Sequence, residues 1–596
     1  MELKNRNEMS PEFQWNLADI FPDRAAWEAA YQEAQTAVGT LGELRGRLAA
    51  SKEALREVLD TVYAVQYKVE MVYLYASLRK NGDNGDPESQ EMEGRAVRLY
   101  MNLSAAIAFL TPEILALDAE TFRAWLESDT LAGYRHILED IGRNRAHTLD
   151  EPREQMLALL SDAAGTASNA FDMLESVDMT FPSIRDENGE EVMLTHGNFG
   201  VYRESADVRV RRDSFEQYFG TYKKYINTLA ALYSGSVKMD SFHARVRGFE
   251  SAREAALFSG NIPVSVYDSL VSVIHESLPI LHRYLKLRRE VLGLDELHMY
   301  DLYCPMVKQD ESRVDFETAK QMVLNATKPL GERYEELLHR AFSERWIDVY
   351  ENKGKTTGAF SCGVYSVHPY VLLNYTDTLE DAFTLAHELG HSMHSFFSSE
   401  KQDYANNDYR IFVAEVASTV NEVLLTMSLL QSETDKKRRA YLLNHFLEGF
   451  RTTVFRQTLF AEFEHKSHAM YEAGETLTAQ ALNKVYRELN EEYYKGAVVD
   501  ELQDIEWARI PHFYNAFYVY QYATGFCSAV AIANRILKEN GAGDYLRFLS
   551  TGGSDYPLEE LKIAGVDLTT PAPIRSAMEV FDRTLGELET LLREGV

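Results

Sequence analysis

The chain has 596 residues, of which 45% are hydrophobic and 26% are charged, and this balance is typical of a folded protein. Its formal net charge is −31, from 92 acidic and 61 basic residues. Such a charge repels phosphate backbones and anionic lipid headgroups, so neither nucleic acid nor a membrane surface is expected as a partner. The excess of acid by itself needs no explanation beyond solubility.

The cysteines and the first residues favour a reducing compartment. Cys304, Cys362 and Cys527 are odd in number, widely separated and without a C-x-x-C pair, so we expect no disulfide framework. Residues 1–5 are polar and lack the apolar core of a secretory signal. No stretch reaches the ~20 apolar residues of a membrane span. We therefore expect a cytoplasmic protein.

Apolar residues recur at spacings of three and four along 26–65, 330–342 and 438–463, and only 15 residues are proline. This periodicity predicts a mainly helical fold. An early exception is Asn188-Gly189, which lies between two short apolar runs and predicts a β-hairpin. We place a boundary near residue 195, which divides the chain into an N-terminal helical lobe, 1–195, and a second domain, 196–596.

A second break in the helical pattern runs from Trp346 to Tyr375. Residues 347–350 and 370–375 have the composition of strands, and Gly354 and Gly358 separate them. A small sheet is thus expected directly before the next helix.

That helix has a clear start signal. Thr378 and Asp381 form the T-x-x-D pattern of a helix N-terminus. No helix breaker follows up to residue 397 except Gly390, which is expected to mark a place where another element packs closely.

The same helix carries His387-Glu388-Leu389-Gly390-His391, an H-E-x-x-H pattern. The two histidines lie one turn apart and about 40° around the helix axis, so their imidazoles can converge on one metal ion. Glu388 lies about 100° from His387, where it can hold a metal-bound water. Zinc suits such nitrogen ligands, and a catalytic zinc keeps one position open for water.

The motif alone is not specific, because a random chain of this composition and length would contain it roughly once in twenty-five cases. The structural alternative is a buried helix with two unrelated histidines. A position in mid-helix, after a predicted sheet and before a suitable third ligand, favours the metal site.

The candidate third ligand is Glu415, an acid in the otherwise apolar run 411–418. A buried carboxylate is costly unless it pairs with a cation or a metal. Glu422 shares the helix face but lies about 10 Å further along the axis, so we favour Glu415. His394 is about 10 Å from His387 along its helix, which excludes it as a ligand of the same ion and leaves a packing or supporting role. A structural salt bridge is the alternative for either glutamate.

Residues 510–522 are rich in aromatic side chains, and Tyr514, Tyr518 and Tyr522 recur every four residues. This spacing predicts one helix face, which by itself is more often a core stripe than a site. Neutral tyrosine and histidine donors, including His512, also suit the oxyanion that develops when water attacks an amide.

Together these motifs resemble the thimet-oligopeptidase family of zinc metallopeptidases. The resemblance rests on residues 387–394, on Glu415-Val416-Ala417-Ser418 and on the late histidine and tyrosines. The segment Tyr518-Val519-Tyr520-Gln521-Tyr522-Ala523-Thr524-Gly525 and the opening Trp15-Asn16-Leu17-Ala18-Asp19-Ile20-Phe21 resemble its oligoendopeptidase F branch. The likeness covers most of the chain, and its specific motifs lie between residues 355 and 530.

The resemblance implies a mainly α, zincin-like enzyme with two helical lobes around a deep substrate channel and a small antiparallel sheet beside the zinc-binding helix. It places the catalytic domain in 196–596 and implies one zinc per chain, held by His387, His391 and Glu415, with Glu388 as general base. It further implies substrate- and transition-state-binding roles for His512, Tyr514 and Tyr518.

We therefore expect an endopeptidase that cleaves short peptides, which add as a strand to the sheet edge around 358–364. The nearest alternative is a helical zinc carboxypeptidase or dipeptidyl carboxypeptidase. A non-enzymatic helical binding protein and a thiol peptidase that uses Cys362 near His368 are more remote.

Overall fold

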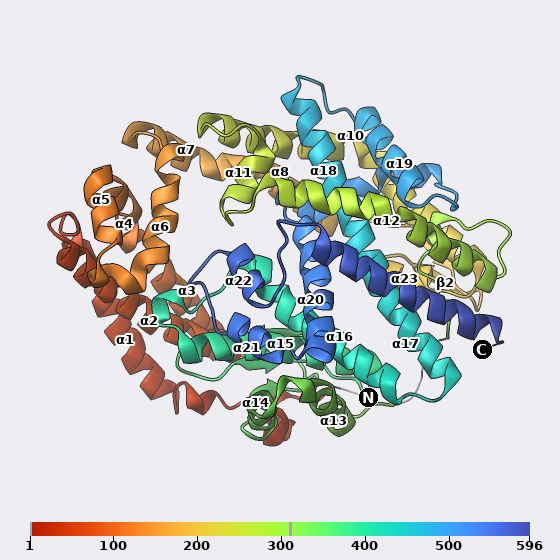
Figure 1. The fold of residues 1–596 in the computed structure, drawn as a ribbon, viewed down its shortest axis with the longest axis horizontal. Helices are drawn as coiled ribbons and strands as arrows, with labels where there is room; N and C mark the ends of the chain where they lie inside the picture. Colours follow the sequence, from red (N-terminus) through yellow and green to blue (C-terminus); the bar gives the residue numbers. More distant parts are fainter. Residues whose placement is uncertain (1–2, 309–312, 596) are drawn as a thin grey trace. The chain divides into compact units, whose positions relative to one another are not determined.

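The computed structural model describes residues 3–308 and 313–595 and is mostly helical (Figure 1), which confirms the fold class expected from the sequence. The chain forms two compact units, each made of three separate segments. The first unit comprises Met1–Ala146, Glu311–Leu429 and Ile532–Val566, and the second comprises His147–Asp310, Leu430–Ala531 and Asp567–Val596. The expected division of the chain into 1–195 and 196–596 stays a prediction.

The first unit contains the helices that begin the chain, a small sheet and the helix with the H-E-x-x-H pattern. Its helices and strands are α1 (Arg24–Thr40), α2 (Lys52–Gly82), α3 (Pro87–Ile107), α4 (Leu110–Leu115), α5 (Ala119–Leu126), α6 (Arg135–Arg143), α13 (Phe316–Thr327), α14 (Glu332–Ser343), β3 (Ile347–Asp348), β4 (Phe360–Cys362), β5 (Tyr370–Leu372), α15 (Leu379–Lys401), most of α16 (Ile411–Ser432), α21 (Ala542–Leu549) and α22 (Pro557–Ile563).

The described part of the second unit is mostly helical and contains a hairpin. Its helices and strands are α7 (Glu151–Ala164), α8 (Thr166–Met173), β1 (Ser183–Arg185), β2 (Glu191–Met193), α9 (His196–Arg203), α10 (Val208–Val246), α11 (Ala252–Phe258), α12 (Val264–Val291), α17 (Lys436–Gly449), α18 (Arg456–Glu472), α19 (Ala479–Tyr493), the first part of α20 (Tyr520–Glu539) and α23 (Ala572–Arg593). The predicted hairpin is confirmed, because β1 pairs antiparallel with β2 around Gly189, whose φ of 81° suits glycine.

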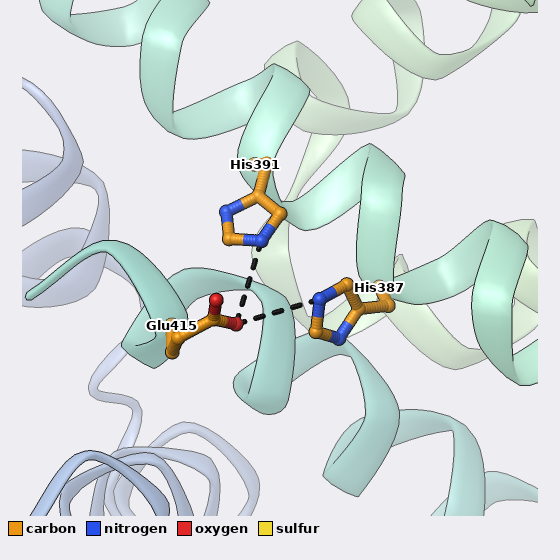
Figure 2. Close-up of side chains that lie close together, drawn as sticks. All are labelled: His387, His391 and Glu415. Atoms are coloured by element: carbon orange, nitrogen blue, oxygen red, sulfur yellow. Dashed lines mark ion pairs between the residues drawn. The ribbon is translucent and has the colours of Figure 1, made fainter. Parts of the chain in front are cut away.

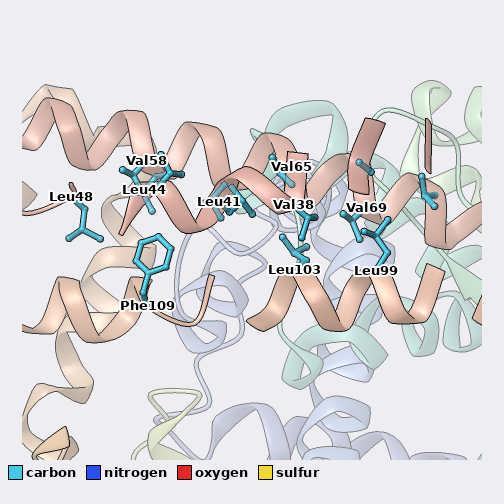
Figure 3. Packing of buried hydrophobic residues seen from close by; sticks show 14 of the residues in the cluster. Val38, Leu41, Leu44, Leu48, Val58, Val65, Val69, Leu99, Leu103 and Phe109 are labelled. Carbon is cyan, nitrogen blue, oxygen red and sulfur yellow. The ribbon is translucent and has the colours of Figure 1, made fainter. Parts of the chain in front are cut away.

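The N-terminal helices of the first unit bury a core of their own (Figure 3). The side chains of Asp23 and Ser51 accept hydrogen bonds from the first turns of α1 and α2, which caps both helices. The helical pattern that the sequence shows over 26–65 is interrupted between them at 41–51. The long helix α2 packs against both α1 and α3, and its apolar residues fill the space between them.

The expected small sheet is present, with strand order β3-β5-β4. Strand β4 pairs antiparallel with β5, which is the pairing that the family resemblance implied. The two strands predicted from composition, β3 and β5, pair in parallel. The central strand β5 is fully buried, whereas β4 is an edge strand. Helix α15 packs against β4 and β5, so the sheet supports one side of the motif helix.

Helix α15 begins as the sequence predicts. The Thr378 side chain accepts a hydrogen bond from the backbone N–H of Asp381, and the Asp381 carboxylate accepts one from the backbone N–H of Thr378. The next helix, α16, is joined to α15 by a hydrogen bond of 3.0 Å from the buried Asn421 amide to the carbonyl oxygen of Ala386. Tyr334 of α14 donates to the same Asn421 side chain at 2.9 Å.

Gly390 marks the closest approach of α15 and α16. A Cβ atom at this position would lie 2.6 Å from both the carbonyl oxygen of Ala417 and the Cα atom of Ser418. Only glycine therefore fits, because backbone atoms of a packed helix cannot move aside as a flexible side chain can.

Helix α16 is the one described helix that is long and apolar enough to cross a membrane on its own, and 67% of its apolar stretch is buried within the protein. A core helix has the same properties. The bent pair Pro87–Leu115 and Ala119–Leu126 passes the same test only when it is counted as a single span. The expected cytoplasmic location stays a prediction.

We predict that Gly390→Ala destabilises the protein by about 1–3 kcal/mol, because the added methyl group forces α15 and α16 apart. Gly220→Ala is the matched control, since Gly220 lies inside α10 with no atom within 4 Å of an added Cβ. The control is expected to keep or raise stability, as alanine favours helix. Thermal unfolding followed by circular dichroism measures both variants, and equal midpoints would contradict the packing argument.

Candidate metal centre

Two histidines of α15 and one glutamate of α16 converge in the first unit (Figure 2). The Nε2 atoms of His387 and His391 lie 3.4 Å and 3.5 Å from the same carboxylate oxygen, Oε2 of Glu415. One donor atom from each of the three residues lies within 4.8 Å of the others. The structure thus brings together the three residues that were predicted from the sequence as metal ligands.

The donor set fits a catalytic zinc ion. Two imidazole nitrogens and one carboxylate oxygen are a known three-ligand set for zinc, which leaves a fourth position open. The three side chains are only partly buried, with exposed fractions of 27% for His387, 17% for His391 and 42% for Glu415, so a ligand can reach the open position.

The Glu415 carboxylate is held in its charged form. Burial raises its pKa, but the hydrogen bond and charge of His391, the charge of His387 and the Ser418 hydroxyl together lower it to about 2. The Ser418 hydroxyl donates to Oε2 of Glu415 at 2.9 Å and so orients the carboxylate toward the histidines. Ser418 itself lies at the crossing of α16 with Gly390.

Glu422 occupies the other side of His387. The Nδ1–H of His387 donates to Oε1 of Glu422, whereas Nε2 of the same ring faces Glu415. Burial lowers the pKa of His387, but this hydrogen bond and the surrounding carboxylates outweigh it and raise the pKa to about 9. A carboxylate on the second ring nitrogen fixes the tautomer and orientation of a metal-binding histidine.

From the sequence, Glu422 is either a rival of Glu415 for the metal or a partner in a structural salt bridge. The structure instead gives the two acids of α16 different positions around one imidazole ring. Their spacing of seven residues, which puts both on one helix face, was the available signal for this arrangement.

Glu388 is buried within this group, with 6% of its surface exposed. Burial raises the pKa of its carboxyl group, while the charges of His387 and His391 oppose that shift. A carboxylate whose pKa is raised in this way is a better proton acceptor than one in water. Its place on α15 beside both histidines is the one that the H-E-x-x-H pattern predicts.

His394 is not part of the group formed by His387, His391 and Glu415. It is fully buried, its ring stacks on Tyr409 with 3.6 Å between centroids, and burial lowers its pKa to about 3. It is therefore neutral and contributes packing.

The late aromatic segment does not form the single helix that its spacing predicted. Pro511–Tyr514 is a short 3-10 helix, Phe517 has a φ of 58°, and α20 begins only at Tyr520. The backbone N–H of Phe517 donates to the buried carboxyl group of Glu464 at 3.0 Å, which holds the turn. This contact is distant in sequence, so spacing alone could not reveal it.

The broken helix places Tyr514 apart from His512, Tyr518 and Tyr522, which lie together. His512 stacks with Tyr518 at 6.1 Å between centroids, and its Nε2 lies 3.2 Å from the hydroxyl of Tyr522. Tyr514 instead stacks on Phe171 of α8 at 4.6 Å. These residues belong to the second unit, and the roles expected for His512, Tyr514 and Tyr518 stay predictions.

Comparison with known proteins shows relatives over the whole chain. The family model described as peptidase family M3 matches residues 201–580, and a model described as oligopeptidase F matches residues 113–181. Oligopeptidase PepF of Bacillus subtilis is 46% identical over 99% of this chain and 89% of its own length. Group B oligopeptidase PepB of Streptococcus agalactiae is 42% identical over 99% of both chains.

Solved structures show the same fold. A structure described as a putative peptidase from Chlamydophila abortus has a TM-score of 0.94 and 34% identity, covering 99% of this chain and 100% of the other. Oligoendopeptidase-F from Enterococcus faecium has a TM-score of 0.74 and 38% identity, covering 95% and 99%. The sequence, the fold and the His387, His391 and Glu415 group agree, and the chain belongs to peptidase family M3.

Proposed function

We propose that this protein is a zinc-dependent endopeptidase that hydrolyses internal bonds of short oligopeptides. The observation that carries the proposal is the convergence of His387, His391 and Glu415 beside the buried Glu388, in a chain of peptidase family M3. Relatives named oligopeptidase and oligoendopeptidase F support the substrate class.

The side chains of His387, His391 and Glu415 would hold one zinc ion. Zinc, when bound, supplies Lewis acidity that polarises a peptide carbonyl and lowers the pKa of water to about 7. Glu422 would fix the orientation of His387 through its hydrogen bond to Nδ1, which leaves Nε2 for the metal.

Glu388 would act as the general base. Its carboxylate accepts a proton from the attacking water and then delivers that proton to the nitrogen of the leaving amine. Its burial favours this role, because a carboxylate whose pKa is raised accepts a proton more readily than one in water.

The peptide would bind as an added strand on the free edge of β4. Strand β4 has β5 on one side only, so its outer edge can pair with an extended chain through main-chain hydrogen bonds. We further propose that His512, Tyr514 or Tyr518 donates a hydrogen bond to the oxyanion that develops at the scissile carbonyl.

The thiol alternative has little support in the structure. Burial and the charges of Glu70 and Asp408 raise the pKa of Cys362 to about 11, so the reactive thiolate is scarce near neutral pH. His368 stacks on Trp346 and lies 3.1 Å from an oxygen of Asp19, which occupies its ring in other contacts.

We predict that Glu388→Gln lowers kcat by about 10²–10⁴-fold, because the amide cannot accept the water proton. The zinc content, measured by elemental analysis, is expected to stay at one ion per chain. Glu400→Gln, at the far end of the same helix, is the matched control and keeps full activity. Substantial peptidase activity in Glu388→Gln would refute the base assignment.

The two glutamates of α16 should differ in their effect on metal binding. Glu415→Gln is expected to lose most of the bound zinc, whereas Glu422→Gln should weaken zinc binding by about 10–100-fold. Competition with a chelator of known affinity measures both. Thermal unfolding of the metal-free variants separates metal binding from folding, and a Glu422→Gln protein with unaltered zinc affinity would rule out the positioning role.

Peptides that are acetylated at the N-terminus and amidated at the C-terminus distinguish the endopeptidase from a carboxypeptidase. We expect cleavage at an internal bond, read by mass spectrometry, and its loss with a chelator and return with added zinc. A carboxypeptidase or dipeptidyl carboxypeptidase needs a free carboxylate and would leave these peptides intact. Absence of zinc together with indifference to the chelator would favour the non-enzymatic alternative.

A further inference from the structure

A cavity of about 550 Å³ lies beside strand β4 in the first unit. Helices α2 and α3, strand β4 and the segment 404–408 form its walls. The residues that matter for its chemistry are Glu70, Tyr73, Val97, Tyr100, Met101 and Asp408.

Strand β4 presents alternate residues to two different surroundings. The side chains of Phe360, Cys362 and Val364 line the cavity, and Gly363, which has no side chain, also borders it. The hydroxyl of Ser361 instead lies 2.9 Å from that of Ser392 in α15, and a Cβ on Gly363 would lie 2.4 Å from Cβ of Ser395 in the same helix. One face of β4 is therefore packed on α15 and the other face opens into the cavity.

This alternation carries over to any peptide that pairs with the free edge of β4. Successive side chains of a strand point to opposite faces of its sheet, and a strand added at the edge continues the pleat of its neighbour. Every second side chain of the added peptide thus points to the face on which the cavity lies, and the others point to the face that α15 covers.

Two carboxyl groups of the cavity have no basic partner. Neither Glu70 nor Asp408 forms an ion pair within 3–308 and 313–595, and the neighbours that donate to the Glu70 carboxylate are neutral, namely the amide of Gln66 at 3.4 Å and the hydroxyl of Tyr404. Desolvation raises the pKa of both groups, and the charge of Asp408 adds to the shift of Glu70. A cation brought into the cavity would relieve this cost.

The rim of the cavity is apolar and exposed. Tyr73, Val97, Tyr100 and Met101 have exposed fractions of 38%, 39%, 42% and 65%, unusual for large hydrophobic side chains. Exposed apolar surface that surrounds a cavity is typical of a binding site. Aliphatic stems pack on such surface, and tyrosine rings attract cations, so the rim suits the stem and the head of a long basic side chain.

We propose that this cavity is a specificity subsite that takes a lysine or arginine side chain of a peptide bound to the edge of β4. The rim holds the aliphatic stem, and Glu70 with Asp408 pairs with the charged end. This inference rests on the proposed peptidase function and deepens it, because it names the class of peptide that the site prefers. It assigns Glu70 and Asp408 to peptide binding, apart from the reacting atoms.

The test is a set of blocked peptides that share one sequence and carry lysine, norleucine or glutamate at each position near the cleaved bond. Norleucine keeps the stem of lysine and lacks its charge. At one position, or at two positions separated by a single residue, we expect kcat/KM for the lysine peptide to exceed that for the norleucine peptide by about tenfold. The ratio within one preparation does not depend on the fraction of active enzyme.

Variants that remove one charge test whether the ratio of kcat/KM for the lysine peptide to that for the norleucine peptide depends on the cavity. Glu70→Gln and Asp408→Asn are each expected to lower the ratio at the same position, and Glu70→Lys should reverse it in favour of glutamate. Glu53→Gln is the matched control, because Glu53 is an exposed acid on the same helix and lies outside the cavity. Its ratio should equal that of the unaltered protein.

The outcomes separate the two proposals. Failure of the unaltered, zinc-loaded protein to cleave any peptide in the set would overturn the peptidase function and the subsite with it. Cleavage without a preference for lysine, or with a preference that survives in Glu70→Gln and Asp408→Asn, would overturn the subsite alone. A preference that falls in both variants and persists in Glu53→Gln supports it.

Discussion

The candidate metal centre depends on the close crossing of two helices. Neither α15 nor α16 carries three ligands, so the site exists only where their backbones approach closely enough for Glu415 to reach the histidine pair. Gly390 permits that approach, and Asn421 maintains it through a buried hydrogen bond to Ala386. The same crossing positions Ser418, whose hydroxyl orients the Glu415 carboxylate. A packing constraint between main chains therefore determines the chemistry of the side chains beside it.

The charges around the crossing are unbalanced in a way that suits a cation. Glu388, Glu415 and Glu422 surround two imidazoles, so the group carries more acid than base before any metal binds. Each carboxylate has a separate place. Glu415 faces both Nε2 atoms, Glu422 accepts from Nδ1 of His387, and Glu388 is buried beside them. Because their surroundings differ, three residues of one type can take three different roles.

Much of this arrangement could be predicted from local patterns. The start of α15 after Thr378, the hairpin around Gly189 and the pairing of His387 with His391 follow from spacings within one helix or one turn. Glu415 could be predicted because it is the one acid in an apolar run. The contact of Glu422 with Nδ1 of His387 could not be predicted, because a seven-residue spacing does not say which ring atom an acid will face. The break at Phe517 was missed because Glu464, which holds it, is far away in sequence. The interleaving of the two units is likewise decided by long-range packing, which local patterns do not report.

That interleaving has a consequence for how the protein is made. Helix α21 packs against α15, yet more than a hundred residues that belong to the other unit are synthesised between them. A chain still emerging from the ribosome therefore cannot complete the surroundings of α15 until residues beyond 541 are available. Folding of the unit that holds the candidate metal centre is thus largely a post-translational event, and apolar surfaces such as that of α16 must stay shielded from aggregation until then.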